Sequence, residues 1–123
     1  MKRTLSIALV ALIGSASAVA AADMSGQWAV AADLGGTAVN STCTFKQTGN
    51  SFDGTCKGDG GDSKTSGTVD NQKVTFKYSV DAQGMTYALT YVGTLDQAGA
   101  ELKGNVTVAG AADAEGMFTA KKQ

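Results

Sequence analysis

The sequence has no histidine and no proline, two cysteines, one tryptophan, and no arginine beyond Arg3. Without histidine the chain cannot build a Ser-His-Asp or Cys-His nucleophile, nor a metal site with imidazole ligands. Its acidic residues fall in turns or near the ends of expected strands. None stands beside another on an apolar face, so no carboxyl group is a candidate for acid catalysis with a raised pKa. We therefore expect a protein that is not an enzyme and that carries no cofactor.

A metal site is not expected either. Asp59 and Asp62 lie in a glycine-rich loop at Lys57–Ser63. They lack the regular acid spacing and the terminal glutamate of a calcium loop. A solvated turn is the simpler interpretation of this segment.

Long apolar runs are also missing, except near the N-terminus. Lys2 and Arg3 precede the apolar stretch Leu5–Ile13, and small residues follow at Ala18–Ala22. This pattern is typical of a secretory signal peptide. The stretch is shorter than the roughly 20 apolar residues that cross a bilayer. We expect residues 1–22 to be cleaved and residues 23–123 to form a single domain with no membrane span. We expect this domain to be periplasmic or secreted by a bacterial cell.

The charge of the remaining chain narrows the choice of partner. Of 10 basic residues, Lys2 and Arg3 leave with the signal peptide, so eight remain against 11 acidic ones. A mildly acidic domain without arginine lacks the basic surface of a nucleic-acid-binding protein. We expect no nucleic-acid partner.

Apolar and polar residues alternate with a period of two through most of the chain, which is typical of half-buried antiparallel strands. The connections are short, and no segment has a helical pattern. The fold class predicted is all-β, an eight-stranded antiparallel up-and-down barrel, with a two-sheet β-sandwich as the alternative. The expected strands are around residues 26–33, 38–47, 51–56, 64–69, 73–80, 85–93, 101–108 and 116–122.

A turn at Thr48–Ser51 aligns the second and third strands. It places Cys43 opposite Cys56 and Phe45 opposite Gly54. Opposed residues on antiparallel strands lie close enough for a disulfide. Two cysteines in an exported protein are most simply such a bond. The sequence therefore predicts a structural disulfide between Cys43 and Cys56.

Two later loops predict further pairs. A loop at Asp81–Gly84 places Tyr78 opposite Tyr87. A loop at Leu95–Ala100 places Tyr91 opposite Gly104. Aromatic rings over glycines fit a tightly curved sheet, because glycine marks the bends by which a sheet coils toward closure.

The motif Gly26-x-Trp28 on the first strand resembles the opening of the calycin group, the lipocalin- and avidin-like barrels. Lys121 or Lys122 on the last strand stands where those families place a basic residue across the tryptophan. The resemblance implies a closed barrel, with the cation over the indole contributing about 0.5–1 kcal/mol at an exposed site. Avidin-like sites are walled by several tryptophans, and this chain has one, which argues against biotin as the ligand.

The chain also resembles the bacterial secreted inhibitors of metalloproteases, which are small barrels with one disulfide and an early tryptophan. That resemblance implies that an N-terminal segment, here Asp23-Met24-Ser25, would enter the protease cleft. Secreted protease inhibition is therefore the alternative function.

The leading hypothesis is an exported binding protein for a small apolar ligand, or a structural module with a protein partner. The residues expected to hold a ligand at one barrel end are Tyr78, Tyr87, Tyr91 and Met85, with Gln47 as a polar contact. The competing interpretation is that these rings only fill the barrel, because eight short strands enclose little spare volume.

Overall fold

The computed structural model of this chain describes residues 23–58, 61–82, 84–109 and 114–123. The predicted signal peptide lies outside the described residues, as does Asp59. None of the described residues belongs to a helix long and apolar enough to span a membrane.

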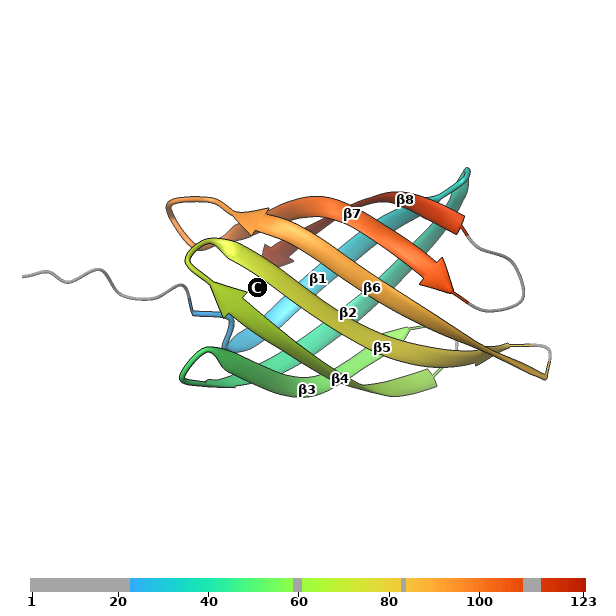
Figure 1. Cartoon of the computed structure of the whole chain (residues 1–123), viewed down its shortest axis with the longest axis horizontal. Coiled ribbons are helices and arrows are strands. Elements are labelled where there is room, and N and C mark those ends of the chain that lie inside the picture. Colours follow the sequence, from blue (N-terminus) through green and yellow to red (C-terminus); the bar gives the residue numbers. More distant parts are fainter. Residues whose placement is uncertain (1–22, 59–60, 83, 110–113) are drawn as a thin grey trace, which may run out of the picture.

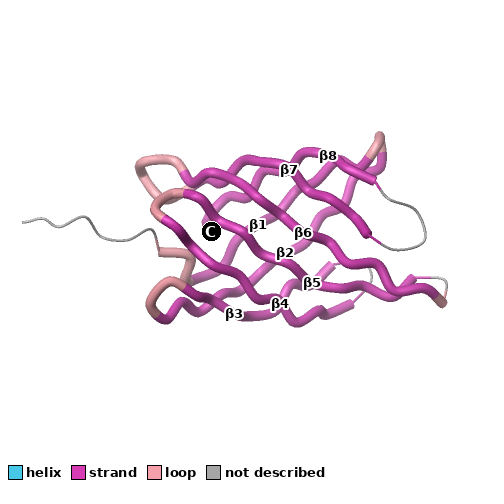
Figure 2. Tube along the Cα trace, viewed as in Figure 1, coloured by secondary structure: helices cyan, strands magenta, loops and turns pink. Residues whose placement is uncertain are grey.

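The described residues form eight antiparallel strands in one closed barrel (Figures 1 and 2). Each strand pairs with its neighbours in sequence, and the first strand pairs with the last. The strands are β1 Gly26–Leu34, β2 Thr37–Thr48, β3 Ser51–Gly58, β4 Gly61–Asp70, β5 Lys73–Ala82, β6 Met85–Leu95, β7 Glu101–Ala109 and β8 Ala114–Lys122.

The predicted up-and-down barrel is confirmed, and the two-sheet sandwich is wrong. The pairing of β1 with β8 over Trp28↔Lys122 to Leu34↔Gly116 closes the sheet. A closed sheet leaves no edge strand with unpaired backbone groups. The strands are longer than the sequence indicated, since β4 begins at Gly61 and β5 runs to Ala82.

Alternation decides which side chains fill the interior. In β5, Val74, Phe76 and Tyr78 are buried, whereas Lys73 and Lys77 are exposed. The largest fully buried side chains are Trp28, Tyr91, Phe76, Met24, Leu95 and Leu102. The half of the barrel nearer the start of β1 is therefore packed with rings and long aliphatic chains.

The predicted disulfide is confirmed. Cys43 and Cys56 are direct partners of β2 and β3, with their Cα atoms 3.9 Å apart. Both side chains are buried. Linking residues 13 apart in sequence stabilises the fold by about 3 kcal/mol in the chain-entropy model. Disulfides persist in oxidising compartments, so the bond is consistent with an extracytoplasmic location.

The register predicted for β5 and β6 is wrong by two residues. Tyr78 lies opposite Leu89, and Tyr87 lies opposite Val80. The predicted four-residue loop is too long, because Ala82 and Met85 already pair. Gly84 has a φ of 78°, a conformation that glycine adopts without strain and that tight hairpin turns require. A shift of two residues leaves each side chain on its predicted face.

The register predicted for β6 and β7 is also wrong by two residues. Gly93, not Tyr91, lies opposite Gly104. The loop is shorter than predicted because Asp96 closes it. Its carboxylate accepts hydrogen bonds from the N–H groups of Ala100 at 2.9 Å and Glu101 at 3.2 Å. These bonds, that from Ala100 foremost, lower the pKa of Asp96.

Candidate functional site

The two ends of the barrel differ. At one end, called here the closed end, β1 begins and the turns after β2, β4 and β6 lie. At the other, called here the Tyr87 end, β5 ends and β6 begins, on the right of Figure 1. The strand directions fix which residues belong to each end.

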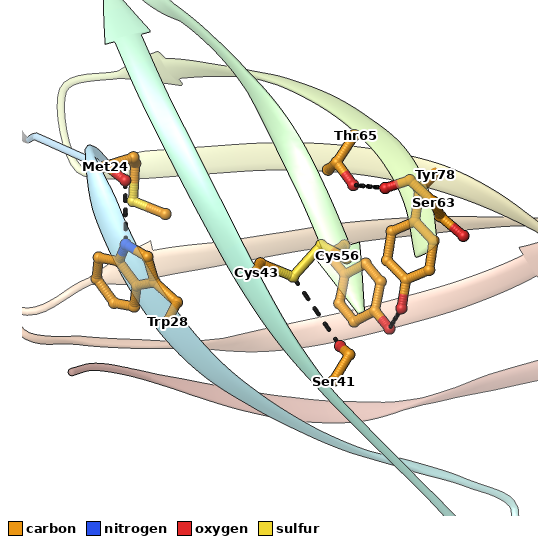
Figure 3. The surroundings of a disulfide bond; sticks show 9 residues. Met24, Trp28, Ser41, Cys43, Cys56, Ser63, Thr65 and Tyr78 are labelled. Carbon is orange, nitrogen blue, oxygen red and sulfur yellow. Dashed lines mark hydrogen bonds between the residues drawn. A yellow bond between two sulfur atoms is a disulfide. The ribbon is translucent and has the colours of Figure 1, made fainter. Parts of the chain in front are cut away.

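Met24 fills the closed end. Its side chain is fully buried, and its backbone is held on both sides. The Met24 N–H donates to Gln47 Oε1 at 2.7 Å, and the Met24 carbonyl accepts from Trp28 Nε1 at 3.0 Å (Figure 3). The Gln47 N–H donates to Ser25 Oγ at 2.9 Å. The segment before β1 therefore folds back over the barrel end as a plug.

Asp23 fixes the start of this plug. The Ser25 N–H donates to Asp23 Oδ1 at 2.9 Å. The hydrogen bonds from the backbone and side chain of Ser25 lower the pKa of Asp23.

Lys122, rather than Lys121, lies over the tryptophan. Its Nζ is 5.8 Å from the centre of the Trp28 ring, and it is the Cα partner of Trp28 across the closing pair of strands. Lys121 pairs with Ala29 and is exposed on the outer face of the barrel. The assignment of barrel closure to Lys121 is therefore corrected to Lys122.

Gln47 does not join the predicted ligand residues. It lies at the closed end, bonded to Met24 and Ser25, whereas Met85 begins β6 at the Tyr87 end. Its Nε2 donates to the Gly49 carbonyl at 3.0 Å. The polar contact proposed for a ligand is instead part of the plug.

Three rings form a stack along the barrel interior. Phe76 and Tyr91 are nearly parallel, with ring centres 4.6 Å apart. Tyr91 and Tyr78 are 5.6 Å apart at 15°. Tyr78 is the ring of this stack nearest the Tyr87 end, and Figure 3 shows it beyond the Cys43–Cys56 bond from Trp28. The stack of buried rings thus ends at Tyr78.

The hydroxyls of Tyr78 and Tyr91 share one hydrogen bond, 2.9 Å long. Burial of the ring, together with the neighbouring Tyr78, raises the pKa of Tyr91, so its hydroxyl keeps its proton at neutral pH. Two hydroxyls supply two protons, and the shared bond uses one. The other O–H has no acceptor among the described residues.

Beyond Tyr78 the inward-facing side chains are only partly buried. Five apolar side chains pack against the core but remain partly accessible to solvent, and all lie on strand segments at the Tyr87 end: Leu34, Val39, Val80, Tyr87 and Val108. Ser41 and Ser63, which face inward beside the disulfide, are also half-buried. We call the five apolar side chains the apolar rim.

The structure therefore brings together three of the predicted ligand residues. Tyr78 and Tyr91 form the hydrogen-bonded floor, and Tyr87 belongs to the apolar rim above it. Met85 is 45% exposed at the tip of the hairpin. The sequence did not reveal that Met24 plugs the barrel, because a single apolar residue before the first strand forms no recognisable pattern.

The floor and the apolar rim differ in chemistry. The floor offers one hydroxyl donor, and the rim offers apolar surface. Across the described ranges, no three histidine, cysteine, aspartate or glutamate side chains lie close enough to hold a metal ion. Comparison with protein-family models and with curated proteins finds no match for this sequence.

Removing both hydroxyls should make the protein more resistant to alkali. In the unfolded chain tyrosine ionises near its ordinary pKa of 10.0, whereas the pKa of folded Tyr91 is raised. Because folding favours the protonated form of Tyr91, this side chain stabilises the folded state below pH 10. That stabilisation is lost as the pH rises above 10. We expect the Tyr78→Phe/Tyr91→Phe variant to lose less stability than the wild type between about pH 9 and 11.

Urea unfolding at a series of pH values measures this effect. Tyr87→Phe is the matched control, because it removes a hydroxyl from a half-buried ring outside the pair. Equal losses of stability in the wild type and the double variant would show that burial does not raise the pKa of Tyr91.

Proposed function

We propose that this chain is an exported, non-enzymatic binding protein with a calycin-like barrel, and that it holds a small apolar ligand at the Tyr87 end. The observation that carries the proposal is the O–H of the buried tyrosine pair that has no acceptor among the described residues. A buried donor left unpaired costs about 1–3 kcal/mol. A ligand with an apolar body and one acceptor, such as a carbonyl oxygen, would satisfy it.

The apolar rim supports the same chemistry. Rings and aliphatic chains that surround one or two polar groups are typical of small-molecule sites. Val80 on β5 is the cross-strand partner of Tyr87, and Val108 on β7, on the other side of β6, is the partner of Leu89. They would contact the apolar body of a ligand whose acceptor reaches the tyrosine floor. Export is supported by the disulfide and by the signal-peptide pattern of residues 1–22.

The plug weakens the alternative of protease inhibition. An inhibitory N-terminal segment must be free to enter a protease cleft. Met24 is fully buried and bonded to Gln47 and Trp28. If cleavage follows Ala20, only Ala21–Asp23 precede the anchored residue.

A matched pair of probes tests the proposal. Ethylbenzene and acetophenone share one skeleton, but only acetophenone carries a carbonyl acceptor. We expect both to shift the methyl NMR signals of Val80 and Val108, and to leave Val69 and Val74 at the closed end unshifted. In Tyr78→Phe/Tyr91→Phe, the affinity of acetophenone relative to ethylbenzene should fall about 2- to 10-fold, the range that a neutral hydrogen bond provides.

Two results would contradict the proposal. One is the absence of any shift at the apolar rim with either probe at about 1 mM, near the weakest affinity that such a titration resolves. The other is an unchanged ratio of the two affinities in the double variant, which would remove the tyrosine pair from the site. Tyr87→Phe again serves as the control, since it should leave that ratio unchanged.

A further inference from the structure

A second hollow lies on the outside of the barrel, over the pair of strands that closes it. This groove has a volume of about 810 Å³ and runs along β1. Ala29 and Ala31 face outward there, and their neighbours across the sheet are longer: Thr42 and Asn40 on β2, Lys121 and Thr119 on β8. We call it the seam groove. It lies on the outer face, whereas the tyrosine pair lies inside.

Positive charge gathers in the seam groove although the chain is net negative. Lys57, Lys103 and Lys121 line it, with Glu101 as the one acidic side chain among the lining residues. The whole sequence carries a formal charge of −1. Lys103 lies 3.9 Å from Glu101. Within the described part of the chain, neither Lys57 nor Lys121 makes an ion pair, although their Cα partners on one side are Asp62 and Glu101.

The two unpaired lysines stand on opposite walls. The cross-strand row runs from Lys57 through Thr42 and Ala29 to Lys121. Three strand spacings separate the ends of this row, about 14 Å at about 4.8 Å each. An elongated molecule with repeated negative charges can lie along this row and contact both ammonium groups.

The remaining lining groups favour a hydroxyl-bearing ligand. The side chains of Asn40, Thr42 and Thr119 make no hydrogen bond within the described ranges, so their donors and acceptors are available. Both edges of β1 are already paired, with β2 and with β8. A peptide could therefore not add as a strand, which is how extended peptides commonly bind sheets. Recognition must use side chains alone.

We propose that the seam groove binds an acidic oligosaccharide. Its carboxylate or phosphate groups contact Lys57 and Lys121, and its hydroxyls contact Asn40, Thr42 and Thr119. A second outer groove, of about 530 Å³, provides a comparison. It holds Lys46 and Lys77 with Asp53 between them, so its excess of positive charge is smaller.

Titration of the ¹⁵N-labelled mature protein with three probes tests the proposal. An alginate hexasaccharide carries carboxylates, an oligomer of glycerol phosphate carries phosphates, and maltohexaose is neutral. We expect at least one acidic probe to shift the amide signals of Ala29, Ala31 and Thr119, with an affinity that falls as salt is added. Maltohexaose should bind at least about tenfold more weakly. Binding of the alginate alone or of the phosphate oligomer alone supports the proposal and identifies the anionic group.

Two double variants remove the same charge from different grooves. Lys57→Gln/Lys121→Gln should weaken binding of the acidic probe by about tenfold, whereas Lys46→Gln/Lys77→Gln should change it by less than about twofold. Equal losses in the two variants would overturn the proposal, because they would show attraction to overall charge. Binding of maltohexaose as tight as that of the acidic probes, or no binding of any probe, would also overturn it.

Discussion

Replacement of Gly104 by alanine is expected to lower the free energy of unfolding by more than about 3 kcal/mol. Gly104 faces Gly93 across β6 and β7, and the backbones approach closely at this pair. A Cβ at Gly104 would collide with the Val92 carbonyl oxygen and with the Gly93 Cα. These are backbone atoms in the middle of two strands, so they cannot move aside as a flexible side chain can. The usual gain of about 0.5–1 kcal/mol from replacing glycine by alanine is too small to offset the clash.

Gly58→Ala is the matched control for this substitution. It also lies on a strand, but its nearest neighbour would be the Asn40 carbonyl oxygen at 3.1 Å, near the strand end. We expect a change within about 1 kcal/mol. Urea unfolding of both variants, followed by circular dichroism, measures the difference. A Gly104→Ala variant as stable as Gly58→Ala would contradict the close pairing of Gly93 with Gly104.

Replacement of Met24 by alanine is expected to cost about 2–5 kcal/mol, the range for truncating a fully buried methionine. The Met24 side chain is fully buried at the closed end, so its removal leaves a cavity beside Trp28. The backbone bonds of Met24 to Gln47 and Trp28 do not depend on its side chain. The loss should therefore reflect packing alone.

Met117→Ala is the control for Met24, because Met117 is 70% exposed on the outer face. It should change stability by less than about 0.5 kcal/mol. Tryptophan fluorescence reports the unfolding of both variants, and the Met24 variant should also show a red-shifted native emission as water reaches the indole. Equal stability of the two variants would mean that the segment before β1 does not plug the barrel in solution.

The sequence was sufficient to predict the barrel, its strands and the disulfide. Alternation fixed the buried faces, and the short turn between β2 and β3 left one register, in which Cys43 meets Cys56. The registers around Tyr87 and Gly104 could not be obtained in the same way. There the loop length was ambiguous, and a shift of two residues keeps every side chain on its face. These two registers are decided only by the turn geometry at Gly84 and by the hydrogen bonds of Asp96.

The candidate site was predicted in part. The three tyrosines share the inner face by alternation alone, but the Tyr78–Tyr91 contact follows from the corrected register. Gln47 could have been excluded from the sequence. In an up-and-down barrel the end of the second strand and the end of the fifth lie at opposite ends, because alternate strands run in opposite directions. The seam groove depends on which strands close the barrel, which the sequence pattern does not specify residue by residue.

The carbonyl stretching band of bound acetophenone tests most directly whether the tyrosine floor donates to a ligand. A ketone that accepts a hydrogen bond absorbs at a lower frequency than the same ketone in an apolar solvent. Difference infrared spectra should show this lowering for acetophenone bound to the wild type, and a band at the apolar-solvent position for acetophenone bound to Tyr78→Phe/Tyr91→Phe. A wild-type band at the apolar-solvent position, or an equal lowering in both proteins, would contradict the proposed site.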